Sequence, residues 1–197
     1  MRGALPFAGA LITATATPAN AHLMNSGFGP FYDGLAHPLI SPDDLLPALA
    51  VTLLAGLNGR RFGRWVLATL PAAWLLGMAS GWALGLPSAP PAWGMAVATA
   101  LTGAMVASDL PLPLVAVAGW AALLGALHGY GNGHELAATT GGLLAVAGIA
   151  CSLAVVVSLV AGQVVVLQAQ WARLAVRISG SWIAAVGLLM FGWSMRS

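Results

Sequence analysis

Long apolar runs, separated by short polar stretches, decide the class to which this chain belongs. Several of the runs approach the roughly 20 residues that a helix needs to cross a bilayer. Of the 197 residues, 59% are hydrophobic and 6% are charged, and the mean hydropathy is +0.90. This composition excludes a soluble single domain. It predicts an all-α, polytopic membrane helix bundle that is held together by packing between helices.

The N-terminus has the pattern of a secretory signal peptide. Arg2 supplies the positive charge, a moderately apolar core follows, and Ala19-Asn20-Ala21 forms a small-x-small cleavage site. Cleavage after Ala21 would make His22 the first residue of the mature protein. The alternative is an uncleaved extra helix, because the threonines of this segment are tolerated in lipid.

Six apolar segments follow, and we expect each of them to form a transmembrane helix. Their approximate limits are 41–58, 65–86, 92–108, a segment from the turn at 108–111 to 130, 135–167 and 178–194. The first begins at Ser41-Pro42-Asp43-Asp44, where serine suits the N-cap, proline the first position and acids the positive helix end. We therefore divide the chain into a signal peptide, 1–21, and a single six-helix transmembrane domain, 22–197.

The arginines indicate how this domain lies in the membrane. The chain has seven arginines and no lysine, and five of the arginines lie in two clusters: Arg60, Arg61 and Arg64, and Arg173 and Arg177. Basic clusters beside apolar runs are typical of the cytoplasmic side. We therefore expect a multi-pass protein of the bacterial inner membrane whose mature N-terminus and C-terminus are periplasmic. Nucleic acid is not an expected partner.

The remaining ionisable residues are concentrated in two stretches. Of four histidines and five acidic residues, all but Asp109 lie in 22–44 or in the run from His128 to Glu135. In the expected orientation, the start of the first span and the end of the fourth share the outer face. Ionisable groups at membrane depth are costly, so their concentration indicates function. Imidazole and carboxylate groups together suit nickel, cobalt or zinc.

Seven residues in these stretches are candidate metal ligands: His37, Asp43, His128 and Glu135, with weaker cases for Asp44, His134 and His22. Helix capping is a strong alternative for the two aspartates, and a solvated loop followed by a helix acid is the alternative for His134 and Glu135. His22 could chelate a metal through its amine and imidazole only if the signal peptide is removed. His128 would lie one turn inside the membrane boundary, where an imidazole needs a partner.

Glycines recur at four-residue spacing in two of the predicted spans. They are Gly77, Gly81 and Gly85 in the second span, and Gly125, Gly129 and Gly133 in the fourth. Small residues at this spacing allow helix backbones to approach closely. The alternative is that glycine, with 25 residues, is simply frequent. The glycines after His128 also allow a sharp turn whose carbonyls face a cavity.

The two stretches resemble the motifs of the HupE/UreJ family of hydrogenase and urease accessory membrane proteins. Members carry an HPxxGxDH-type motif at the first span and an HGxAHGxE-type motif at a later one. The corresponding segments here are 37–44 and 128–135. His37, Asp43, His128 and Glu135 match the motifs, so the resemblance implies that these four residues bind metal.

The departures from the motifs indicate a divergent branch with more oxygen ligands. Asp44 stands where a second histidine is expected, and Ser41 and Pro42 replace the glycine and the residue before the aspartate. Asn132 replaces the second histidine of the later motif, and His134 lies two residues further on.

The resemblance implies a divalent-metal permease, with nickel as the first expected substrate and cobalt as the second. Two other classes stay open: a non-transporting metal-binding or assembly protein for a metalloenzyme, and an intramembrane metal-dependent hydrolase with Glu135 as its base. The hydrolase ranks last because no substrate is indicated, so we do not expect an enzyme. The expected partners are the lipid bilayer and the metal ion; metalloenzyme maturation proteins and a homo-oligomer are also consistent with the resemblance.

Overall fold

The computed structural model describes residues 26–84, 90–137, 142–166 and 169–196, and the regular structure within these ranges is helical. The helices are α1 (Pro30–Ile40), α2 (Pro42–Asn58), α3 (Arg60–Leu84), α4 (Ala92–Ala107), α5 (Leu114–Leu136), α6 (Gly142–Val166) and α7 (Gln170–Ser194). The predicted all-α class is confirmed for this part of the chain. The expected signal peptide and His22 lie outside the described residues.

The lengths of the helices are those of a membrane protein. Four of them, α3, α5, α6 and α7, are long and apolar enough to cross a membrane. Helices α1 and α2 pass the same test only as a pair, and they are bent by 66° at the break between them. Helix α4 has 16 residues, which gives a length of about 24 Å, shorter than a hydrocarbon core of about 30 Å. Six spans therefore stay a prediction.

Three features of the helix boundaries differ from the sequence prediction. Helix α1 precedes the first predicted span and is not among the six predicted helices. Glu135 was expected to begin the fifth span, yet it lies in the last turn of α5, because the helix continues through the glycines where a sharp turn was predicted. The arginine clusters lie within the N-terminal turns of α3 and α7 instead of in loops, since a long side chain can extend from near a helix end to water.

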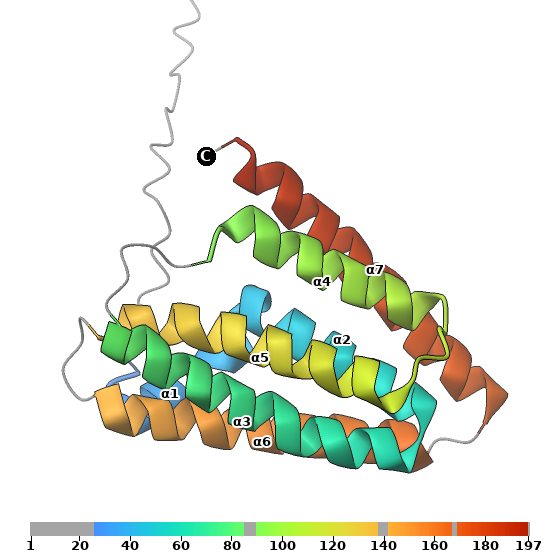
Figure 1. Ribbon diagram of the computed structural model, residues 1–197, viewed down its shortest axis with the longest axis horizontal. Coiled ribbons are helices and arrows are strands. Elements are labelled where there is room, and N and C mark those ends of the chain that lie inside the picture. Colours follow the sequence, from blue (N-terminus) through green and yellow to red (C-terminus); the bar gives the residue numbers. More distant parts are fainter. Residues whose placement is uncertain (1–25, 85–89, 138–141, 167–168, 197) are drawn as a thin grey trace, which may run out of the picture.

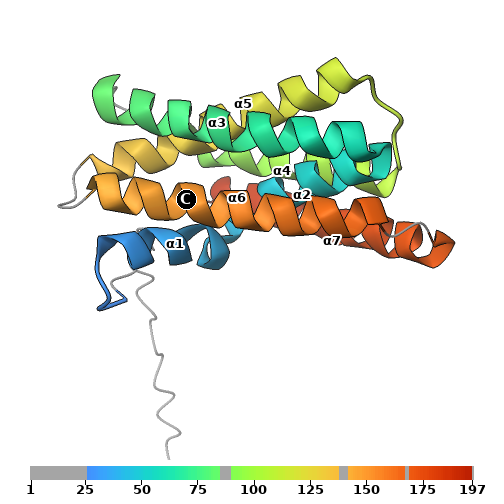
Figure 2. The same cartoon turned by 90° about the horizontal axis from the view of Figure 1, so that it is seen from below.

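Helix α2 is the centre of the bundle. It contacts each of the other six helices, and four of its apolar side chains are fully buried: Ala50, Val51, Leu54 and Ala55. Helices α4 and α7 form a pair on one side of α2, α3 and α6 lie on the other side, and α5 lies in front of α2 (Figure 1). Helix α1 packs along α6, as the view from below shows (Figure 2). The N-terminus of α2 is therefore surrounded by other helices.

The contact between α3 and α5 depends on glycine. A side chain at Gly125, Gly129 or Gly133 of α5 would overlap a backbone carbonyl of α3, at Leu70, Trp74 and Met78 respectively. The paired numbers rise together, so the two helices run in the same direction. Gly77 and Gly81 of α3 face the backbone of α5 in the same way. The predicted role of these glycines in helix contact is confirmed for the described residues; Gly85 lies outside them.

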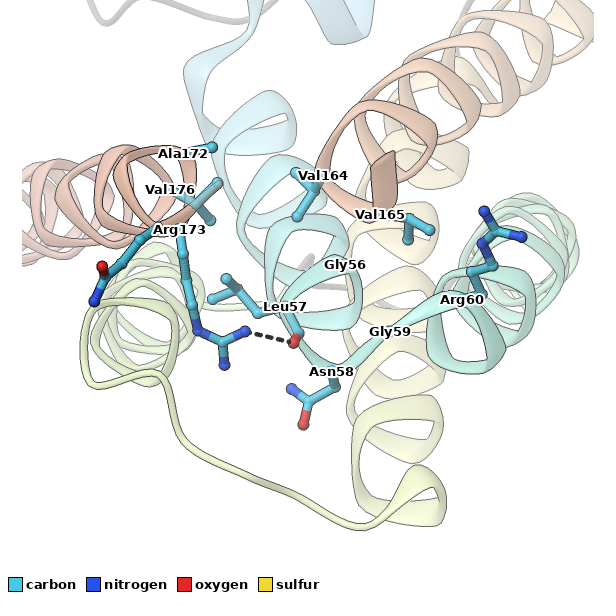
Figure 3. Close-up of a pocket in the computed structure, with 11 residues that line it drawn as sticks. Gly56, Leu57, Asn58, Gly59, Arg60, Val164, Val165, Ala172, Arg173 and Val176 are labelled. Carbon is cyan, nitrogen blue, oxygen red and sulfur yellow. Dashed lines mark hydrogen bonds between the residues drawn. The ribbon is translucent and has the colours of Figure 1, made fainter. Parts of the chain in front are cut away.

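The two ends of the bundle differ in chemistry. The C-terminal ends of α3 and α5 and the start of α6 lie at one end, and the α2–α3 junction, the α4–α5 connection and the start of α7 lie at the other (Figures 1 and 2). A cavity at the second end is lined by both Arg60 and Arg173 (Figure 3). The two arginine clusters therefore share one end, as the sequence predicted.

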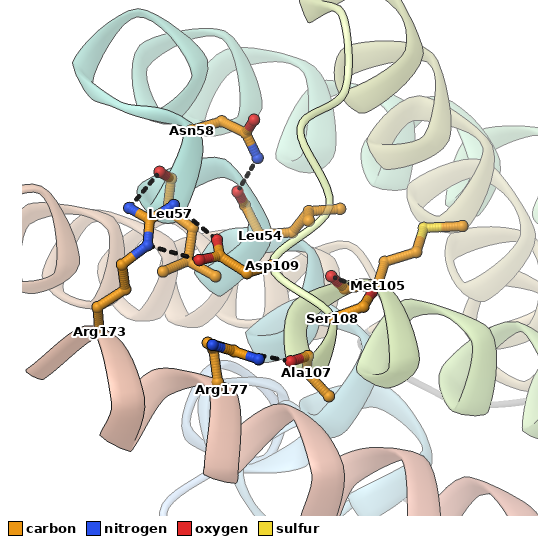
Figure 4. Close-up of polar contacts among 9 residues, drawn as sticks. All are labelled: Leu54, Leu57, Asn58, Met105, Ala107, Ser108, Asp109, Arg173 and Arg177. Carbon is orange, nitrogen blue, oxygen red and sulfur yellow. Dashed lines mark hydrogen bonds and ion pairs between the residues drawn. The ribbon is translucent and has the colours of Figure 1, made fainter. Parts of the chain in front are cut away.

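Arg173 connects α7 to the turn after α4 through an ion pair. Its Nε and Nη2 atoms donate to the two carboxylate oxygens of Asp109 at 2.6 and 2.7 Å, and Arg177 Nε donates to the Ala107 carbonyl at 2.9 Å (Figure 4). Asp109 has a φ of 53°, in the left-handed region that aspartate and asparagine tolerate better than most residues. The ion pair therefore lies next to a constrained turn.

We expect Asp109→Asn to destabilise the protein only slightly. Asparagine keeps the size of the side chain and tolerates the same φ, but it removes the charge that pairs with Arg173. The Arg173 side chain is 52% exposed, so the loss in unfolding free energy should be at most about 1 kcal/mol. Titration of both proteins with a denaturing detergent measures this difference in unfolding free energy. A loss above about 3 kcal/mol, the value typical of a broken buried pair, would contradict this interpretation.

Candidate metal-binding site

A one-residue break between α1 and α2 places a histidine beside an aspartate. Ser41 has an extended backbone, as expected for a residue that precedes proline, and Pro42 begins α2. The Ser41 N–H donates to the His37 carbonyl at 3.0 Å, and the Asp44 N–H donates to the Ser41 carbonyl at 3.1 Å. Across this break, His37 Nε2 lies 3.2 Å from Asp44 Oδ2.

Helix α5 brings two more polar side chains to the same carboxylate. His128 Nδ1 lies 3.1 Å from Asp44 Oδ1, and Asn132 Nδ2 donates to Asp44 Oδ2 at 2.8 Å. His128 and Asn132 are four residues apart, so they share one face of the helix. The two ligand-rich stretches, which the sequence predicted to share one membrane face, therefore meet at Asp44.

This cluster is inside the protein. The exposed fractions of Asp44, His37, His128 and Asn132 are 4%, 6%, 4% and 8%. A buried carboxylate is costly unless it is paired and hydrogen-bonded, and both oxygens of Asp44 have partners. The fully buried Trp74 stacks on His128, with 5.3 Å between ring centroids and 26° between ring planes. The indole thereby limits how the imidazole can turn.

The second ring nitrogen of His128 is suited to a ligand. His128 Nε2 is buried and has no hydrogen-bond partner within the described residues. When Nδ1 donates its hydrogen to Asp44, Nε2 keeps a lone pair. Carboxylates orient metal-binding histidines in this way in many proteins. Within the described ranges, no group of three or more His, Cys, Asp or Glu side chains is arranged to hold a metal ion.

Comparison with known proteins identifies the family. The family model described as HupE / UreJ protein matches residues 10–190. The chain belongs to the HupE/UreJ family. No curated protein and no solved structure matches it. Membership confirms the resemblance that the two motifs indicated, and it places the chain among membrane proteins linked to nickel and cobalt handling.

The remaining motif acids of this HupE/UreJ protein lie around the buried cluster. Asp43 is exposed in the first turn of α2, and Glu135 is exposed in the last turn of α5. Both are close enough for their charges to interact with His37 and Asp44. The structure therefore places these two acids near the central carboxylate, with no side-chain hydrogen bond to it among the described residues.

The last histidine of the second motif is placed differently. His134 is partly buried and stacks on Tyr130, with ring centroids 6.5 Å apart and 9° between ring planes. It has no direct contact with Asp44 among the described interactions. The last turn of α5 therefore holds His134 to one side of the buried cluster.

Sequence reasoning missed parts of this HupE/UreJ site. It gave Asp44 a weaker case than Asp43, whereas Asp44 is the residue that both buried histidines contact. Asn132 was noted only as a replaced histidine, although its spacing from His128 could have placed it on the same face. Trp74 lies in another span, and no sequence pattern connects it with His128.

Proposed function

We propose that this HupE/UreJ protein is a divalent-metal permease of the bacterial inner membrane, with nickel as its first substrate and cobalt as its second. The observation that carries the proposal is the buried Asp44 carboxylate between His37 and His128, with His128 Nε2 left without a partner. Imidazole nitrogen and carboxylate oxygen suit these metals. The family membership supports the same choice of substrate.

In this proposal the metal enters from the periplasmic end, where the mature N-terminus and the C-terminus also lie. Asp43 and Glu135 are exposed, so their charges attract the cation first. His128 Nε2 then binds it, and His37 and Asp44 exchange their mutual contact of 3.2 Å for contacts to the metal. His134 and, after signal cleavage, His22 are further ligands to test. A cytoplasm-negative potential favours entry by about 2.3 kcal/mol per charge for each 100 mV.

A non-transporting metal-binding or assembly protein is the second candidate function. A permease needs polar groups along the inner half of the bundle, and two polar residues of α6 in this half, Ser158 and Gln163, are exposed. Thr52 and Ser152 are buried, but Thr52 Oγ1 donates to a carbonyl of its own helix. The small number of inward-facing polar groups among the described residues favours this second candidate.

Metal entry into proteoliposomes separates the two candidates. The full chain is reconstituted with a metal-sensing dye inside, an inside-negative potential is applied, and nickel, cobalt, zinc and manganese are presented separately. We expect nickel entry, and we expect His37→Ala and His128→Ala each to reduce its initial rate roughly 10–100-fold, the range seen when groups around a metal are removed.

His134→Ala tests the weaker ligand case, because it removes an imidazole from the same helix at a position that has no hydrogen bond or ion pair with Asp44 among the described residues. Its effect should be the smallest of the three. Stoichiometric binding without entry would favour the assembly protein. Unchanged entry in both the His37 and the His128 variants would reject the proposed site.

A further inference from the structure

The arginine end of the bundle contains a cavity that the metal site does not use. Its volume is about 370 Å³, and it lies between the α2–α3 junction, the end of α6 and the start of α7. Arg60 and Arg173 reach it from opposite sides (Figure 3). Asn58 and Gln170 also line it. The cavity therefore has charged and polar side chains in its lining and lies at the opposite end from His128.

The charge around this cavity is positive. Asp109 offsets the charge of Arg173 through their ion pair. Arg60, Arg61 and Arg64 are exposed, and within the described chain they have no hydrogen bond or ion pair from their side chains. Three guanidinium groups on adjacent turns of α3 therefore lack an anionic partner, although guanidinium is well suited to phosphate.

Two helix N-termini reach the same cavity. Helix α3 follows Gly59, which has no side chain to cap it, and α7 follows Ala169, which makes no side-chain cap. Gly59 and Gln170 both line the cavity. The first N–H groups of a helix lack partners within the helix and favour negative charge. The helix N-termini and the arginine side chains thus both favour an anionic ligand.

An apolar groove continues from the cavity along the bundle. A hollow of about 560 Å³ between α3 and α6 shares Arg60 and Val165 with the cavity. Arg64 also lines the groove. Most of the other lining residues are apolar or glycine: Gly63, Leu67, Ala161, Gly162 and Val166. A groove of this kind, with arginines at one end, matches a ligand that has an anionic head and a hydrocarbon chain.

We propose that this end of the protein binds one anionic phospholipid. Its phosphate lies in the cavity between Arg60 and Arg173, and one acyl chain lies in the groove between α3 and α6. Basic pockets between transmembrane helices bind anionic head groups. A free phosphate ion would fill the cavity but not the apolar groove. The site is separate from the metal site and does not depend on metal transport.

Native mass spectrometry of the full chain tests this assignment. The protein is exchanged into detergent with equal amounts of phosphatidylglycerol and phosphatidylcholine, and the retained lipid is counted. We expect one phosphatidylglycerol to be retained in preference to phosphatidylcholine. The variant R60Q/R64Q should weaken retention roughly fivefold for each arginine, as expected for cationic side chains at a membrane surface.

R61Q/R196Q is the matched control. It removes the same charge, but neither arginine lines the cavity or the groove. Retention should therefore stay near that of the unchanged protein, and R60K/R64K should keep most of it. Circular dichroism and size exclusion show whether each variant is folded. Equal retention of the two lipids, or an equal loss in both double variants, would overturn the proposal.

Inorganic phosphate distinguishes a lipid from a soluble anion. Added in excess to the protein with bound phosphatidylglycerol, it should displace little of the lipid, because it cannot replace the acyl chain in the groove. Displacement at millimolar phosphate would overturn the lipid assignment. R60Q/R64Q should leave the affinity for nickel unchanged, so failure of this proposal and failure of the metal site can be told apart.

Discussion

Asp44→Asn is expected to lower the affinity for nickel roughly 100-fold, whereas Asp43→Asn, one residue earlier, should lower it by less than about tenfold. Asp44 contacts both buried histidines and is 4% exposed. Asparagine would have only one oxygen to accept from them, and it would remove the negative charge that a bound cation requires. Asp43 is exposed, and in the proposed function it acts only through its charge. Titration calorimetry in nanodiscs measures both affinities.

The two variants form a matched pair. Each replaces a carboxylate with an amide of the same size in the first turn of α2, so any general effect on the helix start is common to both. Circular dichroism and detergent unfolding would show whether Asp44→Asn stays folded. Equal losses in the two variants would mean that the acids only attract the metal. A larger loss in Asp43→Asn would move the site to the protein surface.

The convergence of the two motifs could be predicted from the sequence, because it depends on topology alone. The clusters at Arg60 and Arg173 predict the direction in which each span crosses the membrane. In that orientation, the helix ends that carry His37 and His128 lie on the same face of the membrane. In the structure, both of these histidines contact the carboxylate of Asp44. The glycine spacing in α5 likewise predicted a close helix contact, because a four-residue repeat lies on one face of a helix.

The detail of the cluster could not be predicted in this way. Each residue turns a helix by about 100°, so whether Asp43 or Asp44 faces inward depends on how α2 packs. That packing follows from the break at Ser41 and from contacts with helices distant in the sequence. The position of Trp74 on His128 depends on the register of α3 against α5. The glycines around His128 are compatible with either a turn or a helix. Close packing of Gly129 and Gly133 against α3 favours the helix.

The α3–α5 contact connects that packing with the metal site, and Gly129→Ala tests the connection. A Cβ atom at Gly129 would overlap the Trp74 carbonyl, so α3 and α5 must separate or shift. Overpacking of this kind costs about 1–3 kcal/mol of unfolding free energy. Gly129 follows His128, and Trp74 stacks on that imidazole. We therefore expect weaker nickel binding together with lower stability.

Gly131→Ala is the control for this prediction. It lies in the same helix two residues further on, and its nearest neighbour to a new Cβ would be Pro90 Cδ at 3.9 Å, an ordinary contact. Alanine is favoured over glycine inside a helix by about 0.5–1 kcal/mol, so Gly131→Ala should be slightly stabilising and should bind nickel normally. Detergent unfolding and calorimetry give both quantities. If Gly129→Ala were as stable as Gly131→Ala, the close contact between α3 and α5 would not be what holds His128 beneath Trp74.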